Sequence, residues 1–177
     1  MKLNSYKKIL IIIVSRIGDT LLTTPAIKSI ASHYKDAEIT VLGHPKRYKV
    51  LQHLPFIHYT GSISKNSAIW RGRLGKTYDL AFVYGYDESL VLYALRVSKK
   101  TIAFKQDNSR INNRLYKTVE FPTSQGMHFV DIFMSLPKAI NISTVTKRLS
   151  LSLTEKDRLF AENTLIENNL NNKILVG

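Results

Sequence analysis

Hydrophobic and polar positions alternate along this chain in a way that predicts a strand first and a helix directly after it. Residues 9–14 form an unbroken aliphatic run that is rich in β-branched side chains and too short to span a membrane. Such a run is typical of a strand buried on both faces, as at the centre of a parallel sheet. A polar turn with Gly18 and Asp19 follows, and then a helical pattern over residues 20–34 with Pro25 near its start. The pattern therefore predicts a central strand that carries Asp19 at its carboxyl end.

The rest of the chain repeats this alternation. Short apolar runs predict further strands at residues 38–42, 57–60, 80–84 and 101–104. Apolar positions at helical spacing predict helices over residues 45–53, 70–76, 89–97, 127–140 and 154–168. Thr154 and Asp157 are spaced as a capping box at the start of the last helix, whereas residues 105–125 are polar and predict an irregular loop. Strands that alternate with helices predict an α/β fold with a doubly wound, mostly parallel, Rossmann-like sheet.

The end of the sequence resembles the start of another α/β unit. Residues 173–177 have the pattern of a strand followed by glycine, directly after a helix. We therefore expect residues 1–145 to form one Rossmann-like domain and residues 146–172 to form a linker and hinge helix. Residues 173–177 would then be the first strand of a second domain.

Composition indicates an ordinary globular protein with an anionic partner. The 177 residues are 44% hydrophobic and 22% charged, and the absence of cysteine excludes disulfides and thiolate metal sites. The net charge of +13 favours nucleic acid, anionic lipid headgroups or phosphorylated sugars as partners. The cations are scattered along the chain, and no nucleic-acid-binding motif is present. The first apolar run is shorter than the ~7–15 residues of a signal peptide, which predicts a cytoplasmic protein.

Asp19 is the strongest candidate for chemistry. In open parallel sheets, ligands bind in the crevice at the carboxyl ends of the strands, where this acid is expected to lie. A carboxylate there is suited to act as a general base. The alternative is an acid that stabilises the start of a helix, and the pattern alone does not separate the two roles. His128 and Asp131 lie three residues apart on a predicted helix, and two ligands alone do not make a metal site.

Residues 15–25, Ser-Arg-Ile-Gly-Asp-Thr-Leu-Leu-Thr-Thr-Pro, closely resemble the N-terminal signature of the glycosyltransferase family 9 heptosyltransferases. These enzymes transfer heptose from ADP-heptose to the inner core of lipopolysaccharide. Weaker similarities follow in the family's order at residues 43–45, 54–57, 78–80, 126–131 and 149–165. The resemblance covers nearly the whole chain and implies the GT-B fold, in which two doubly wound domains face each other across a cleft. This chain would be the N-terminal, acceptor-binding half, and the donor half, with its Gly-Pro-His segment, would follow residue 177.

The resemblance implies roles for several residues. Asp19 would be the general base of an inverting transfer, and Arg16 would contact an anionic core sugar or phosphate. Gly18 would allow close backbone approach or unusual dihedral angles. The full set of acceptor-binding candidates is Arg16, Gly18, Thr20, His128, Arg110 and Arg114. For the two arginines in the polar loop, a merely solvated loop is the alternative.

The same resemblance implies the ligands. The acceptor would be a core precursor of the Kdo-lipid A type, and the donor would be ADP-heptose, with no other cofactor. No Asp-x-Asp motif occurs, which is consistent with transfer without a metal. The protein would lie against the anionic inner leaflet of the inner membrane and bind no nucleic acid, and this half alone would be inactive. The alternatives are a non-catalytic α/β module that binds anionic glycolipid or another polyanion and, from charge alone, a nucleic-acid-binding domain.

Overall fold

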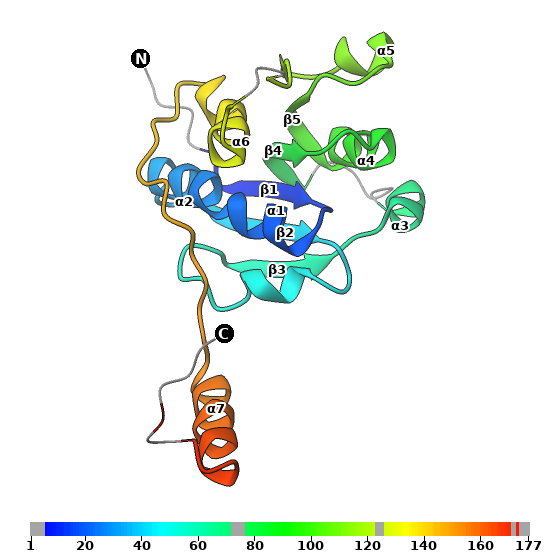
Figure 1. Ribbon diagram of the computed structural model, residues 1–177. Coiled ribbons are helices and arrows are strands. Elements are labelled where there is room, and N and C mark those ends of the chain that lie inside the picture. Colours follow the sequence, from blue (N-terminus) through cyan, green and yellow to red (C-terminus); the bar gives the residue numbers. More distant parts are fainter. Residues whose placement is uncertain (1–5, 72–76, 123–125, 171–172, 174–177) are drawn as a thin grey trace.

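The computed structural model describes residues 6–71, 77–122, 126–170 and 173. Within these residues, six strands form one sheet in the order β3-β2-β1-β4-β5-β6, and every neighbouring pair is parallel (Figure 1). The strands are β1 (Lys8–Ile13), β2 (Glu38–Gly43), β3 (Tyr59–Ser62), β4 (Tyr78–Tyr84), β5 (Ser98–Phe104) and β6 (Lys117–Val119). The predicted doubly wound α/β fold is therefore confirmed.

Helices cover both faces of the sheet, and β1 is buried between them. One face carries α1 (Ile17–Leu22), α2 (Thr24–His33), the 3-10 turn η1 (Tyr48–Leu51) and α6 (Phe129–Lys138). The other face carries α3 (Lys65–Trp70), α4 (Glu88–Val97) and α5 (Ser109–Asn112). Ile9, Ile11 and Ile13 belong to the first core, and Leu10 and Ile12 belong to the second. This division confirms the prediction that the first strand is buried on both faces.

The order of the strands reverses next to β1. From β1 the chain passes through α1 and α2 on one face to reach β2, and from β4 it passes through α4 on the other face to reach β5. The two connections therefore diverge from the carboxyl ends of β1 and β4. In open α/β sheets, this divergence creates a crevice in which ligands bind.

The helix predicted over residues 20–34 is wrong in its start and in its continuity. α1 begins at Ile17 and ends at Leu22, and α2 begins at Thr24 with Pro25 in its first turn. Proline has no backbone N–H to continue a helical hydrogen-bond ladder, so the chain ends one helix and begins another here. Consequently Asp19 lies in the first turn of α1 rather than in a loop before it.

Other segments also differ from the prediction. Residues 105–125 are not irregular throughout, because they contain α5, which Asn108 caps, and the short edge strand β6. The strand predicted at residues 57–60 lies two residues later, as β3, and the helix predicted over residues 45–53 is only the 3-10 turn η1. The helix predicted over residues 70–76 lies earlier, as α3, with Arg71 already extended. Residues 72–76 lie outside the described residues.

Residues 141–153 have no regular structure and are attached to α2. Ser29 Oγ accepts a hydrogen bond from the Val145 backbone N–H at 3.1 Å, and Thr24 Oγ1 accepts one from the Ser150 N–H at 2.9 Å. The helix α7 (Glu155–Glu167) follows with the predicted capping box of Thr154 and Asp157, and it stands apart from the sheet (Figure 1). Most of the strand predicted at residues 173–177 lies outside the described residues, so the division into domains stays a prediction.

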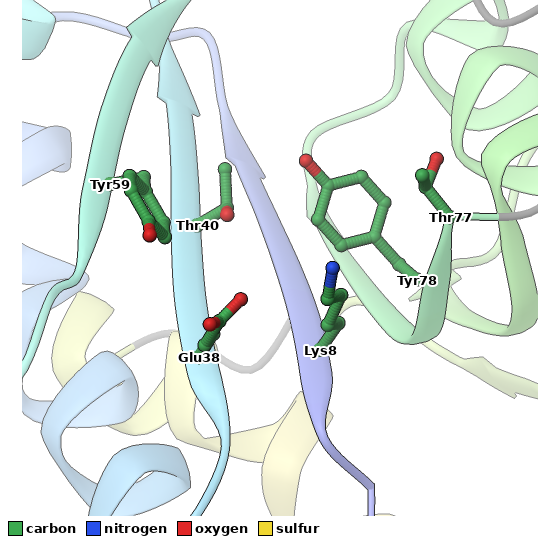
Figure 2. Close-up of a pocket in the computed structure, with 6 residues that line it drawn as sticks. All are labelled: Lys8, Glu38, Thr40, Tyr59, Thr77 and Tyr78. Carbon is green, nitrogen blue, oxygen red and sulfur yellow. The ribbon is translucent and has the colours of Figure 1, made fainter.

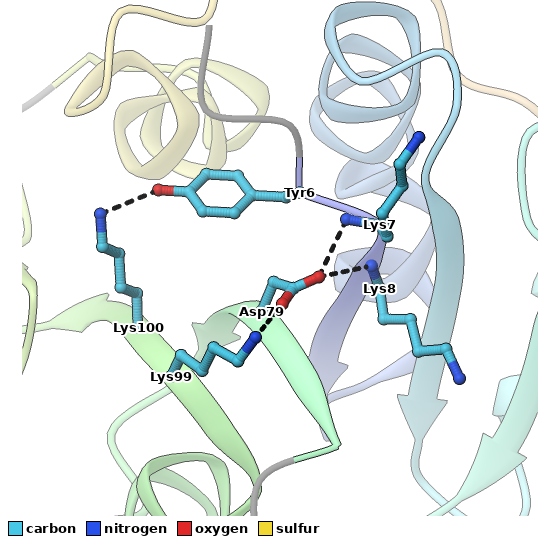
Figure 3. A network of polar contacts seen from close by, with 6 residues as sticks. All are labelled: Tyr6, Lys7, Lys8, Asp79, Lys99 and Lys100. Carbon is cyan, nitrogen blue, oxygen red and sulfur yellow. Dashed lines mark hydrogen bonds and ion pairs between the residues drawn. The ribbon is translucent and has the colours of Figure 1, made fainter. Parts of the chain in front are cut away.

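Asp79 joins three strands at the opposite, amino-terminal edge of the sheet (Figure 3). Its Oδ2 accepts hydrogen bonds from the backbone N–H groups of Lys7 and Lys8 at 2.9 and 3.1 Å. Its Oδ1 forms an ion pair with Lys99 Nζ at 2.8 Å. The hydrogen bond from Lys99, followed by that from Lys7, lowers the pKa of the Asp79 carboxyl group. Asp79 thus fastens the start of β1 to the starts of β4 and β5.

We expect Asp79→Ala to lower the free energy of unfolding at neutral pH by about 1–2 kcal/mol, because it leaves two backbone N–H groups without their acceptor. The folded-state pKa lies below the unfolded one, so the ionised carboxylate stabilises the fold above the ordinary aspartate pKa. That stabilisation is lost as the pH falls through the folded-state pKa, so the two proteins should become more alike in acid. Urea titrations at several pH values measure this, with the exposed Asp36→Ala as control. A difference that is independent of pH would contradict the prediction.

Among the described residues, no helix is both long enough and apolar enough to cross a bilayer.

Candidate functional site

A pocket of about 170 Å³ lies in the crevice between the carboxyl ends of β1 and β4, and Asp19 is part of its wall. Its lining residues come from the ends of three strands and from the segments around α1 and α6: Ile13, Val14, Ser15, Asp19, Tyr84, Gly85, Tyr86, Phe104, Phe121, Phe129 and Phe133. Gly85 closes β4 with φ of +149°, a conformation that residues with a Cβ rarely adopt. The pocket is where an open parallel sheet is expected to bind a ligand.

The Asp19 carboxylate faces Ser15 and makes no helix cap. The Ser15 hydroxyl donates a hydrogen bond to Asp19 Oδ2 at 2.5 Å across one turn of the chain. Among the described residues, neither a backbone N–H nor a cation pairs with this carboxylate, and no partner is present at Oδ1. The carboxylate is therefore fixed on one oxygen, while the other has no partner among the described residues.

The loop that carries Asp19 is fixed by further polar contacts. Arg47, between β2 and η1, donates from Nη1 to the Ser15 carbonyl oxygen at 2.9 Å. Thr20 is 1% exposed, and its hydroxyl donates to the Arg16 carbonyl oxygen at 2.9 Å. The Thr23 hydroxyl donates to the Asp19 carbonyl oxygen at 2.8 Å. These contacts limit the movement of the carboxylate. Proton transfer requires a base that is held in position in this way.

Arg16 and Gly18 lie on the outside of this loop. Arg16 is exposed and precedes α1 in an extended conformation. Gly18 lies within α1 and its φ is not positive, so the expectation of unusual dihedral angles is wrong. A Cβ at Gly18 would meet no atom within 4 Å, which leaves open space for a ligand at this position. The Thr20 hydroxyl, in contrast, is turned inward and does not face the pocket.

Comparison with known proteins supports the fold. No family sequence model matches the chain, and no curated protein matches it by sequence. The glycosyl transferase family 9 structure from Veillonella parvula matches with a TM-score of 0.83 and 18% identity, over 97% of this chain and 52% of that one. E. coli ADP-heptose LPS heptosyltransferase II matches with a TM-score of 0.69 and 17% identity, over 89% of this chain and 50% of that one. An E. coli heptosyltransferase with ADP matches with a TM-score of 0.62 and 15% identity, over 81% and 50%.

The chain has the fold of half a family 9 glycosyltransferase. It spans about half the length of these solved structures. The fold implied by the resemblance of residues 15–25 is therefore confirmed.

None of the six acceptor-binding candidates lines the Asp19 pocket, and three of them also lie away from the loop that carries Asp19. His128 caps α6 by accepting a hydrogen bond from the Val130 N–H at 3.2 Å, and it lines a separate pocket beside the ion pair of Asp131 and Lys147. Arg110 is exposed on α5. Arg114 lines a groove with Ser98, Lys99 and Tyr116, at the amino-terminal ends of β5 and β6. Arg114 thus lies near the amino-terminal ends of the strands, whereas Asp19 lies at their carboxyl ends.

A larger pocket, of about 310 Å³, also lies at the amino-terminal edge (Figure 2). Its walls include the first residues of four strands, and the full lining is Lys8, Glu38, Thr40, Tyr59, Thr77 and Tyr78. The amino-terminal ends of the strands are not where open α/β sheets bind ligands. Figure 2 shows side chains spread along the strands rather than directed at one point. Among the described residues, no group of three or more potential metal ligands comes together anywhere.

The sequence did not reveal the aromatic part of the Asp19 pocket. Tyr86 is far from Phe121 and Phe129 in the sequence, and only the sheet order brings it next to them. Ser15 is not among the acceptor-binding candidates, yet it contacts the candidate base directly. One signal in the sequence could have identified these two pocket residues: Ser15 and Tyr86 each follow the last residue of a buried strand by two positions.

Proposed function

We propose that this chain is the acceptor-binding half of a glycosyltransferase that transfers heptose from ADP-heptose to the lipopolysaccharide inner core. The observation that carries the proposal is the Asp19 carboxylate, fixed by Ser15 in the pocket between β1 and β4 with Oδ1 open to a ligand. The likeness in fold to solved heptosyltransferases supports the same assignment.

In the proposed reaction, Asp19 takes the proton of an acceptor hydroxyl while that oxygen attacks the anomeric carbon of the donor. The new bond joins the acceptor oxygen to this carbon. The bond from the carbon to the phosphate oxygen breaks, ADP leaves, and the configuration at the carbon inverts. The other half of the enzyme would hold the donor across the cleft, and transfer would proceed without a metal. The exposed guanidinium group of Arg16, beside the pocket, is suited to an anionic group of the acceptor.

The net charge of +13 supports an anionic acceptor of the Kdo-lipid A type and peripheral contact with the cytoplasmic leaflet of the inner membrane. The same charge also favours a second candidate function, a non-catalytic module that binds anionic glycolipid. The two candidates differ in one respect, because only the transferase releases ADP.

The test is an assay of the full-length protein with ADP-heptose and two acceptors, Kdo-lipid A and its heptosylated form. We expect ADP release together with an increase in the mass of one acceptor by one heptose, and no release when UDP-glucose replaces the donor. The 177-residue chain alone should bind the acceptor and release no ADP. Acceptor binding without transfer by the full-length protein would favour the non-catalytic module, and neither binding nor transfer would refute both.

A further inference from the structure

The mouth of the Asp19 pocket is aromatic and partly open to solvent. Tyr86 is 53% exposed and Phe129 is 48% exposed, although both line a pocket whose deeper wall includes the buried rings of Tyr84, Phe104 and Phe133. Large apolar side chains that remain exposed at one place mark a surface where a ligand binds. We call Tyr86, Phe121 and Phe129 the aromatic rim.

The rings of the rim are held in place by other rings. Tyr86 stacks on Phe104 with ring centroids 6.1 Å apart and planes 28° apart, and it meets Phe121 edge-on at 5.2 Å. Phe121 also meets Phe104 at 5.2 Å, and Phe129 lies 6.0 Å from Phe133. A ring that is already fixed loses little freedom when a ligand stacks on it, so the rim is preorganised for a flat or weakly puckered apolar surface.

The pocket contains a negative charge and no positive one. Asp19 is the one acidic residue in its lining, and no lysine, arginine or histidine lines it among the described residues. A ligand carboxylate or phosphate in this space would lose its water, gain no cation and lie beside a like charge. The exposed Arg16 lies at the loop outside the lining.

One polar group in the wall has no partner in the protein. The hydroxyl of Tyr84 is buried and makes no hydrogen bond among the described residues. Burial raises the pKa of this hydroxyl, so it remains protonated and able to donate. A buried hydroxyl without a partner is costly in free energy, and Tyr84 is one of the residues that line the Asp19 pocket.

We infer that the acceptor unit that enters the Asp19 pocket is a neutral sugar ring, stacked by its C–H face on Tyr86, with the anionic groups of the acceptor outside the pocket. A pocket of about 170 Å³ has room for one such ring. This inference rests on the proposed function and narrows it. The reacting hydroxyl belongs to a neutral sugar such as heptose, and not to the sugar acid Kdo.

The test uses saturation-transfer NMR on this chain with two probes, the methyl glycoside of heptose and the methyl ketoside of Kdo. The heptoside should bind, with the strongest transfer to its ring C–H protons. Tyr86→Ala should raise its dissociation constant about three- to tenfold, in line with the energies of aromatic contacts. Tyr86→Phe keeps the ring and should bind as the unchanged protein does. Tyr59→Ala removes a tyrosine of similar exposure, 59%, from the edge strand and should have no effect.

Three outcomes would overturn the inference: binding of the heptoside that Tyr86→Ala leaves unchanged, binding of the Kdo ketoside that depends on Tyr86, and the absence of binding by either probe. Thermal unfolding of each variant shows whether the ring packing has survived. The binding test does not require turnover, so its result is separable from that of the transfer assay. If this chain binds the heptoside through Tyr86 but the full-length protein releases no ADP, the inference of a sugar-binding pocket would stand and the proposed transferase activity would be rejected.

Discussion

Asp19→Asn should lower kcat of the full-length protein by about 10²- to 10⁴-fold, the range that removal of a general base covers. The amide has the size and shape of the carboxylate, and its oxygen can still accept the hydrogen bond that Ser15 donates to Asp19. It cannot take a proton from the acceptor hydroxyl. KM for the acceptor should therefore change by less than about threefold, because the loss falls on the transition state. Steady-state rates of ADP release measure both constants.

The control for this variant is Asp36→Asn, which changes an exposed acid in the turn before β2 and should leave kcat as it is. Urea unfolding should place Asp19→Asn within about 0.5 kcal/mol of the unchanged protein, as is usual away from buried networks. A variant that keeps more than a tenth of kcat would reject Asp19 as the base. If it also lost stability, the acid would instead have the helix-stabilising role that the sequence alone left open.

The central strand and the position of Asp19 were predictable because local pattern and fold agree there. A short run that is rich in β-branched residues and has no polar interruption has no solvent-facing side, which is typical of a strand between two layers of helices. A parallel sheet then puts the end of that strand at the ligand-binding edge. Elsewhere the pattern misled: Trp70 is apolar yet 70% exposed, and it ends α3 rather than beginning the predicted helix.

The composition of the site was not predictable, because it depends on strand order. Arg114 follows a helix and Tyr86 follows a strand. Nothing in the local sequence assigns Arg114 to the amino-terminal ends of the strands and Tyr86 to the Asp19 pocket. That assignment follows from β6 pairing with β5 in parallel and from β4 lying next to β1. The start of α1 was missed for a different reason. Arg16 provides no side-chain cap, so the sequence lacks the usual signal for a helix terminus.

Leu10→Ala and Ile11→Ala should each lower the free energy of unfolding by about 2–5 kcal/mol, the cost of removing a fully buried aliphatic side chain. Both residues are 0% exposed, and they belong to different cores on the two faces of the sheet. Neither core is a minor one, because each contains a full layer of helices against the same strand. Urea titrations of the two single variants measure the effect, with Thr60→Ala on the edge strand β3 as the control.

Comparison of the two single variants decides whether β1 is the centre of the fold. If the strand were buried on one face only, one variant would cost several kcal/mol and the other less than about 1 kcal/mol, as exposed substitutions do. Two large and similar losses would show that helices on both faces hold β1 in place. The same packing fixes the segment that follows it, because Ser15 and Asp19 extend from the end of β1 and their pocket is lined by Ile13 and Tyr84, which pair across β1 and β4. The position of the candidate base is thus set by the two cores that these variants would weaken.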